Sequence, residues 1–505
     1  MWIRFSRSEV RGIAHYLGVL IVGVSVAMLV PLATALLAAE WEPALDYALG
    51  GVVAAGIGLL LMLADVSQPH ISQRQALIIS ALAWIGASAV AAIPLSLSGN
   101  YGSYLDALFE SVSGFTTSGL NLAVDLDHMA LAHNMWRHLT HLIGGQGIIV
   151  AAVSLALALK GGAFSLYLAE GRDERILPNV MHTARFIWFV TAVWVVSGTV
   201  MLSVVNWVSG MGPARGFLHA FWLTIAAFDT GGFAPMSQNA LYYHSPYLEA
   251  GLLMLMLAGT FNFNLHADIW RGDKGELPKN IEARTLGLNI IVLVAFTALS
   301  FALGTWFSTA SEVWRKGVFH IVSANSGTGH QTVYAGQWPF FGPAALISVV
   351  LAMAFGGMVS STAGGIKSLR IGLIVSSVAL SAKQSLSPTS AVVRIRFHHL
   401  VDRFVTPEIV ASAFTYFTLY VVSYISGGLI GAAYGYDPGA AVFESVSAAA
   451  NVGLSAGVTS PAMPAGLKIL YILQMWSGRL EFLSLVALAV SVGLMFTKQK
   501  GRAVK

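Results

Sequence analysis

The chain has 505 residues, of which 56% are apolar and only 10% are charged. A soluble protein carries about 25% charged residues, so this composition excludes a soluble globular domain and indicates an integral membrane protein. The sequence has no cysteine, which excludes disulfides, thiolate metal sites and cysteine nucleophiles. The net charge of +4 is small, so the placement of the charges is more informative than their sum.

Two apolar segments open the chain. The first runs from about residue 13 to residue 38 behind three arginines, and the second from about residue 49 to residue 63. A signal peptide has similar flanks, but the first segment is too long for one and leads directly into further apolar segments. Because about 20 apolar residues cross a bilayer, we predict that residues 1–74 form two transmembrane helices.

Four units of one design follow. The units are residues 75–160, 183–268, 284–383 and 406–497. Each has a long apolar span, a shorter apolar stretch, a glycine loop and a second long span, expected near residues 76–97 and 135–159, 186–208 and 247–265, 286–307 and 341–382, and 409–433 and 467–496. The shorter stretches, of about 10–14 residues, cannot cross a bilayer and predict re-entrant pore helices. The expected fold is an all-α polytopic membrane protein with roughly ten spans and four half-spans around a central ion pore.

The short stretches repeat one another. Residues 109–120 read F-E-S-V-S-G-F-T-T-S-G-L, and residues 443–454 read F-E-S-V-S-A-A-A-N-V-G-L. In all four units a glycine follows a phenylalanine by ten residues, in the pairs Phe109–Gly119, Phe221–Gly231, Phe319–Gly329 and Phe443–Gly453. Four such spacings between long apolar segments indicate an internal repeat.

The glycine loops predict an ion filter. Glycine allows positive φ and close approach of the backbone to a ligand, and oxygen ligands suit hard cations. No ring of acidic residues is present, so a monovalent cation is favoured over a divalent one. The predicted filter residues are Thr116, Thr117, Ser118, Gly119, Asp229, Thr230, Gly231, Ser326, Gly327, Thr328, Gly329, Ala450, Asn451, Val452 and Gly453.

Positive charge predicts the orientation. With a cytoplasmic N-terminus, most lysines and arginines between spans fall on the inner side, and the outer side keeps only Arg137, Arg215, Arg315, Lys316 and Lys468. This asymmetry is the one expected of inner loops. It places all four glycine loops on the outer side, as uptake requires.

Three further motifs carry a family resemblance. They are H-L-I-G-G-Q-G-I at 141–148, G-G-M-V-S-S-T-A-G-G-I-K at 356–367 and S-G-R-L-E-F at 477–482. With the four loops, they resemble the Trk/Ktr/HKT superfamily of potassium transporters, and most closely its TrkH branch. The resemblance implies potassium uptake through one filter glycine per loop, with Gly119, Gly231, Gly329 and Gly453 in that role. It also implies a homodimer in a bacterial inner membrane, a channel or symport mode of transport, and a TrkA-like cytosolic nucleotide-binding ring as regulator.

One filter residue departs from the expected pattern. Asp229 stands two residues before Gly231, where the resemblance leads us to expect a neutral polar residue. Its carboxylate either adds a cation site or caps local backbone N–H groups. We favour capping, because aspartate is common in turns for local reasons.

The glycine-rich stretch at 356–367 interrupts an otherwise continuous span. It is either a kinked helix packed through small residues or a flexible constriction below the filter. We favour the constriction, because irregular polar backbone at membrane depth needs protein or water around it, and the resemblance makes this loop the gate. The predicted gate and barrier residues are Gly356, Gly357, Ser360, Ser361, Gly364, Gly365, Lys367 and Arg479.

Arg479 is expected near the middle of the membrane, where a charge is costly and marks a functional site by default. One interpretation is a structural pair with Glu481, Glu110 or Glu444. The other, which the resemblance implies, is an electrostatic barrier beneath the filter. Both hold together if a carboxylate tethers the guanidinium.

Other interpretations of the sequence are weaker. His138 and His141 have the spacing of metal ligands, but no third ligand is evident nearby. A translocating subunit of an ATP-driven potassium pump would share the pore architecture, and short filter loops leave open a less selective K⁺/Na⁺ transporter. An intramembrane enzyme is not supported, because the histidines and aspartates that could serve as catalytic groups are scattered along the chain. We therefore expect no enzyme activity, no cofactor and no nucleic-acid partner. The basic segments 160–185 and 383–403 could anchor to anionic membrane lipids, but the resemblance leads us to expect that they dock the regulatory ring instead.

Overall fold

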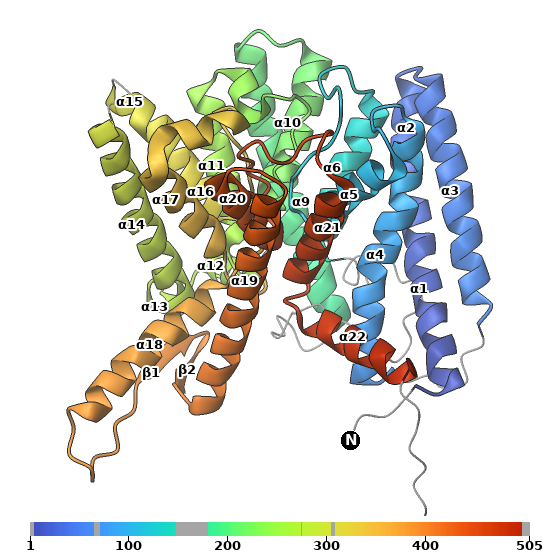
Figure 1. The fold of residues 1–505 in the computed structure, drawn as a ribbon. Helices are drawn as coiled ribbons and strands as arrows, with labels where there is room; N and C mark the ends of the chain where they lie inside the picture. The colour runs from blue at the N-terminus through green and yellow to red at the C-terminus, as the bar shows by residue number, and fades with distance from the viewer. Residues whose placement is uncertain (1–4, 65–70, 148–179, 274, 305–308, 497–505) are drawn as a thin grey trace, which may run out of the picture.

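The computed structural model describes residues 5–64, 71–147, 180–273, 275–304 and 309–496. Most of the predicted basic segment 160–185 and the end of the first unit lie outside these residues. The leading pair consists of α1 (Arg7–Ala27) with its continuation α2 (Leu29–Leu37), and of α3 (Trp41–Met62). These helices lie side by side at one edge of the molecule (Figure 1).

The helices of the four units follow in chain order. The first unit has α4 (Gln73–Leu97), α5 (Tyr104–Phe115) and α6 (Leu131–Gln146). The second has α9 (Val180–Val208), α10 (Pro213–Phe228), α11 (Pro246–Thr260) and α12 (Phe263–Trp270), and α13 (Glu276–Lys279) follows it. The third has α14 (Ile281–Gly304), α15 (Ala310–Val313), α16 (Phe319–Asn325), α17 (Gly342–Ala354) and α18 (Ser368–Ser385). The fourth has α19 (Pro407–Ala433), α20 (Pro438–Ala449), α21 (Ala465–Arg479) and α22 (Leu483–Phe496).

Each unit has a short helix between its longer ones. α5, α10 and α20 have 12, 16 and 12 residues. In the third unit α15 and α16 are joined by a π-helical turn at 314–318, so the short helix is assembled from three pieces. The side chains of Ser103 and Asp437 cap the N-termini of α5 and α20. Each accepts a hydrogen bond from a free N–H group of the first turn.

Two of the predicted second spans are broken rather than straight. α11 and α12 meet at an angle of 103°, and α21 and α22 at 115°. At the second break Glu481 and Phe482 adopt φ of +51° and +65°, a left-handed geometry that a helix cannot continue. A count of apolar residues does not contain this information, because both halves are apolar.

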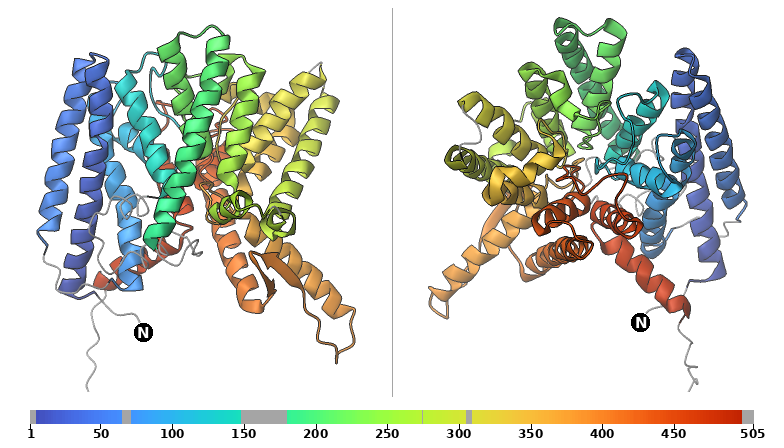
Figure 2. Two further views of the ribbon diagram at one scale, coloured as in Figure 1. Left: turned by 180° about the vertical axis from the view of Figure 1, so that it is seen from behind. Right: turned by 45° about the horizontal axis from the view of Figure 1, so that its top comes forward.

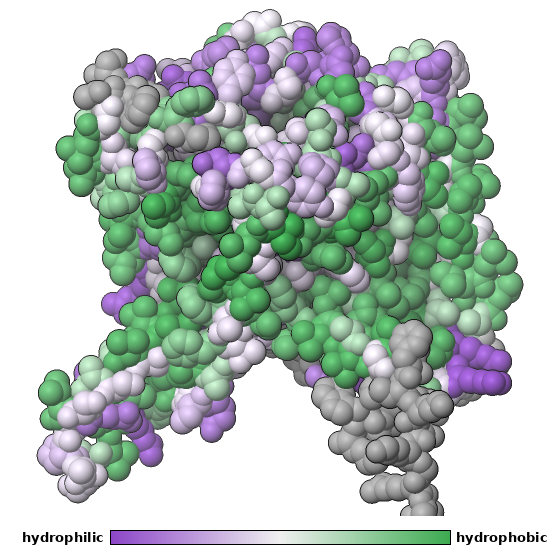
Figure 3. Space-filling view, in the orientation of Figure 1, coloured by the Kyte–Doolittle hydropathy of each residue, from purple (hydrophilic) through white to green (hydrophobic). Residues whose placement is uncertain are grey.

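Six helices of the described residues are long and apolar enough to cross a membrane, or up to eight if each bent pair is one span. On the face shown in Figure 3, apolar residues form a broad band, with hydrophilic residues gathered above it and at the lower corners. Seen from above, the units surround a centre in which the short helices meet (Figure 2). Both observations agree with a polytopic membrane protein.

A small antiparallel hairpin connects the third unit to the fourth. β1 (Arg396–His399) pairs with β2 (Val401–Phe404), with Arg396 opposite Phe404. The hairpin and the start of α1 lie at the same end of the molecule (Figure 1). The predicted orientation requires this, because it makes both of them cytoplasmic.

Candidate ion filter and the segment below it

All four short helices end in the same way. The second residue after each helix is left-handed: φ is +53° at Thr117, +52° at Thr230, +74° at Gly327 and +56° at Asn451. The next N–H bonds back five residues into the helix, as in Ser118 to Ser113 at 2.8 Å and Val452 to Ser447 at 2.9 Å. The other two pairs are Gly231 to Ala226 and Thr328 to Ser323. This is the Schellman cap, and it turns the loop N–H groups toward the helix.

The fourth residue after each helix is a glycine with positive φ. The values are +80° at Gly119, +72° at Gly232, +84° at Gly329 and +90° at Gly453. A Cβ on any of these glycines would overlap a carbonyl oxygen of the neighbouring loop. The overlapping carbonyls are those of Gly231 against Gly119, Thr328 against Gly232, Val452 against Gly329 and Ser118 against Gly453.

These four contacts close a ring. Each of the second, third and fourth loops places the carbonyl of its third residue against the glycine of the preceding loop, and the first loop does the same to the fourth. Backbone oxygens therefore gather from four segments that are separated by about a hundred residues each. The arrangement leaves no space for a Cβ and supplies the hard oxygen ligands that an alkali cation prefers.

The ring changes one sequence assignment. In the second loop the counterpart of Gly119, Gly329 and Gly453 is Gly232, and Gly231 supplies the carbonyl. The phenylalanine spacing misplaced it by one residue, because Phe221 has a neighbouring aromatic, Trp222, that lies at the equivalent distance from the helix end. The Gly-Gly pair was the signal that the choice was ambiguous.

Side chains on the short helices fix the returning loops. Glu110 accepts a hydrogen bond from the N–H of Leu122 at 2.9 Å, twelve residues on. At the same repeat position Glu444 accepts from Ala456 at 2.9 Å, and His320 Nε2 accepts from Thr332 at 3.1 Å. Two glutamates and one histidine thus make the equivalent hydrogen bond in three of the units. The F-E repeat alone did not reveal that the histidine takes the same role.

His141 links two loops. Its Nδ1 donates to the Gly114 carbonyl at 2.8 Å, and its Nε2 accepts from the N–H of Phe233 at 3.3 Å. His138 Nδ1 donates to the carbonyl of Asn134 at 2.7 Å. In the described part of the chain no group of three or more His, Asp or Glu side chains forms a metal site. His138 and His141 therefore form hydrogen bonds with backbone groups of the first and second units.

Asp229 does not cap backbone as we expected. Its carboxylate is buried and accepts from the side-chain amide of Gln146 at 2.6 Å. Its own backbone N–H donates a hydrogen bond at the C-terminal end of α10. The acid thus connects the second loop to the end of α6, a tertiary contact that turn propensity cannot predict.

Residues 355–367 are irregular and buried directly against the loops. The two ends of the segment pair with each other in an isolated β-bridge, in which Gly356 N–H donates to the Ile366 carbonyl at 2.9 Å. A Cβ on Gly364 would overlap the Ala450 carbonyl at the start of the fourth loop. This irregular backbone replaces the middle of the predicted third-unit span and packs against the start of the fourth loop.

Thr362 ties this segment to the second unit. Its hydroxyl lies 3.0 Å from the Phe228 carbonyl and 2.8 Å from the Gly259 carbonyl, and it accepts from Thr230 Oγ1 at 3.2 Å. The backbone is held from the same side, because Thr362 N–H bonds to Gly259 O at 3.3 Å. Thr362 was not among the predicted gate residues, although it lies between two of them.

Arg479 reaches the same place from α21. Its guanidinium donates to the carbonyls of Thr362 at 2.8 Å and Gly144 at 2.5 Å, and to Thr117 Oγ1 at 3.3 Å. It therefore contacts the first loop, the end of α6 and the irregular segment. The three acids considered as its partners have others: Glu110 pairs with Arg137, Glu481 with Arg370, and Glu444 with the loop that follows α20.

A small cavity of about 40 Å³ lies at this junction. Its lining includes Arg479, Lys367, Glu481, Ser360 and Gly364. Lys367 is buried and donates to the Ala363 carbonyl. A cation that left the ring would therefore meet two positive side chains and one carboxylate in a confined polar space.

A bundle of membrane-length helices around four such capped loops is the architecture of a membrane cation transporter. The chain belongs to the TrkH family of cation transport proteins, whose family model matches residues 48–494. It is 30% identical over 486 residues, 96% of each chain, to an uncharacterized cation transporter of Methanocaldococcus jannaschii. It is 28% identical to the Trk system potassium uptake protein TrkH of Escherichia coli K12, over 95% of this chain and 98% of that one.

The fold is also that of a solved structure. The crystal structure of the potassium transporter TrkH from Vibrio parahaemolyticus superposes with a TM-score of 0.80, at 24% identity, over 95% of this chain and 98% of that chain. The family-model match confirms the membership expected from the loop motifs, and this superposition confirms the fold.

Proposed function

We propose that the protein carries potassium ions into the cell across the cytoplasmic membrane, with the four-loop carbonyl ring as its selectivity filter. The observation that carries this proposal is the closed contact of four glycines with four carbonyls. An ion that loses its water needs several oxygens at one point. The relatives named as potassium uptake proteins support potassium as the transported ion.

Residues 355–367 and Arg479 form the gate and the barrier in this proposal. The segment lies against the loops and is held by the guanidinium of Arg479, which adds a positive charge next to the ion path. A like charge in a low-dielectric site repels the departing cation. The gate opens when the segment leaves its bonds to the second unit.

The proposal is tested by radiotracer uptake in proteoliposomes under imposed K⁺, Na⁺ and H⁺ gradients. Potassium uptake that exceeds sodium uptake supports it, and the response to the H⁺ and Na⁺ gradients separates a channel from a symporter. Deleting residues 361–365 raises flux if the segment obstructs the path. A deletion mutant that inserts normally and shows lower flux would count against the gate.

Assembly completes the proposal. The protein works as a homodimer with a cytosolic nucleotide-binding ring, its N-terminus in the cytoplasm of a bacterial cell. The Trk system relatives support this, as does the position of the β-hairpin at the same end of the molecule as the start of α1 (Figure 1). Charge reversal at Arg394 and Arg396 abolishes nucleotide regulation if the 383–403 segment docks the ring, and regulation that survives the reversal excludes that docking site.

A further inference from the structure

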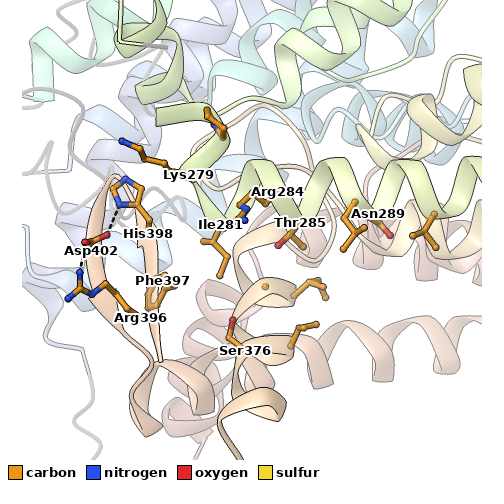
Figure 4. A pocket seen from close by; sticks show the side chains of 16 residues that line it. Lys279, Ile281, Arg284, Thr285, Asn289, Ser376, Arg396, Phe397, His398 and Asp402 are labelled. Carbon is orange, nitrogen blue, oxygen red and sulfur yellow. Dashed lines mark hydrogen bonds and ion pairs between the residues drawn. The ribbon is translucent and has the colours of Figure 1, made fainter. Parts of the chain in front are cut away.

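A large open pocket lies outside the ion path, between α14, α18 and the β-hairpin (Figure 4). Its volume is about 810 Å³. It is at the same end of the molecule as the start of α1 (Figure 1). Neither the filter nor the gate uses any residue of its lining.

One end of the pocket is basic. Lys279 and Arg284 line it from α13 and the first turn of α14, and both are exposed. Within the described part of the chain neither of them has an ion pair. Arg396 also lines the pocket, but it pairs with Asp402 at 3.1 Å. The carboxylate is thus already engaged, and two cationic side chains remain for an anion.

The other end of the pocket is apolar and open to the lipid side. Leu288 and Val292 follow Arg284 at intervals of four residues, so all three share one face of α14. Their side chains are 63% and 54% exposed, and Val375 of α18, across the pocket, is 63% exposed. At 1.5 Å per residue the face changes from charged to apolar over about 12 Å.

We propose that this pocket binds an anionic phospholipid. Lys279 and Arg284 hold the phosphate, Thr285 and Asn289 lie beside the glycerol region, and an acyl chain follows Leu288 and Val292. Both halves of the pocket are needed for this conclusion. A soluble phosphate would leave the apolar wall exposed to water, whereas a zwitterionic lipid carries a cation that gains nothing from two basic side chains.

The test is native mass spectrometry of the full-length purified protein with phosphatidylglycerol and phosphatidylcholine added. We expect wild-type protein to retain phosphatidylglycerol preferentially. The double variant K279Q/R284Q loses roughly fivefold in affinity for each charge, since a surface lysine or arginine contributes about 1 kcal/mol toward anionic lipid. The matched control K383Q/R394Q removes one cation on α18 and one just before the hairpin, neither of which lines the pocket, and it keeps the adducts.

The remaining outcomes overturn the proposal. An equal loss in the control pair would show general surface attraction. Full competition by glycerol phosphate, together with an unchanged affinity of Leu288→Asn, would show a site for a free phosphate. If K279Q/R284Q converts dimers to monomers and keeps the lipid, the pocket is an interface with a second copy. Because only folded particles are weighed, loss of folding is not mistaken for loss of lipid.

Discussion

The four filter loops and the segment 355–367 are both glycine-containing, irregular and buried, yet they are held in opposite ways. Each filter loop bonds N–H groups back to the short helix that precedes it, over five or six residues. The segment bonds to the second unit instead: Met358 N–H donates to Thr260 O at 3.2 Å, and Thr362 N–H to Gly259 O at 3.3 Å. Local bonds fix the loops, whereas tertiary bonds hold the segment.

This difference separates a rigid element from a movable one. A loop held by its own helix keeps its shape while that helix remains folded. A segment held by other units is released when a few tertiary hydrogen bonds break, each worth about 0.5–1.5 kcal/mol net. Selectivity should therefore respond to changes at the glycine ring, and opening to changes at the segment's contacts.

The largest effect is expected from Gly232→Ala. The added Cβ overlaps the Thr328 carbonyl and must adopt a φ of +72°. We expect the preference for K⁺ over Na⁺ to fall at least tenfold in proteoliposome flux, with insertion unchanged. Gly231→Ala places its Cβ 2.5 Å from the His141 ring, but it meets no carbonyl and needs no positive φ, so it should affect selectivity less. The reverse order would restore Gly231 as the filter glycine.

The matched control is Gly435→Ala. Gly435 has a φ of +93° with open space around it, at the end of α19. It therefore carries the left-handed strain of about 1–2 kcal/mol without a carbonyl to displace. Its selectivity should equal that of the wild type. If it loses selectivity too, the effect at Gly232 reports strain rather than the ring.

The contrast between local and tertiary hydrogen bonds also explains which parts of the site can be predicted from the sequence. The repeat, the four loops and three of the four ring glycines could be predicted, because each loop is determined by the helix just before it. Gly232 was displaced by one position because Phe221 and Trp222 are adjacent aromatics. The partners of Asp229, Arg479 and Thr362 come from other units, and neither periodicity nor turn chemistry encodes such contacts.

The second prediction concerns the barrier. Arg479→Gln removes a positive charge that contacts Thr362 and Gly144. Single-channel or tracer flux should rise about tenfold, which corresponds to about 1.4 kcal/mol of barrier, while ion preference changes little. Arg479→Lys keeps the charge and loses the forked hydrogen bonds, so it separates electrostatics from tethering. Flux that stays at the wild-type level in the glutamine variant would contradict the barrier.

Thr362→Val should have a smaller effect on the same segment. It keeps the shape of the side chain and removes the hydroxyl that links the segment to Phe228 and Gly259. Losing about 1 kcal/mol of hydrogen bonding should raise the open fraction about fivefold. The control is Ser361→Ala, because the Ser361 hydroxyl bonds within the segment to Met358 at 2.6 Å. Equal effects of the two variants would argue against release from the second unit.

The smallest effect is expected at the hairpin beyond the far end of α18. Hydrogen bonds to Asp402 and then to Glu276 raise the pKa of His398 above its ordinary value of about 6.5. Both acceptors lie 2.8 Å from the ring nitrogens. A raised histidine pKa stabilises the attachment fully below about pH 6.5, and that contribution is lost as the pH rises through the folded-state pKa.

The chain has no cysteine, so a single Val401→Cys label reports on the hairpin alone. Val401 is 53% exposed and tolerates a dye. The anisotropy of the dye should fall as the pH rises above about 6.5, and a His398→Gln background should remove that step. Ion preference should not change over the same range, because the filter loops are held by their own helices. A selectivity change that follows the anisotropy would show that the loops depend on distant contacts, as the segment does.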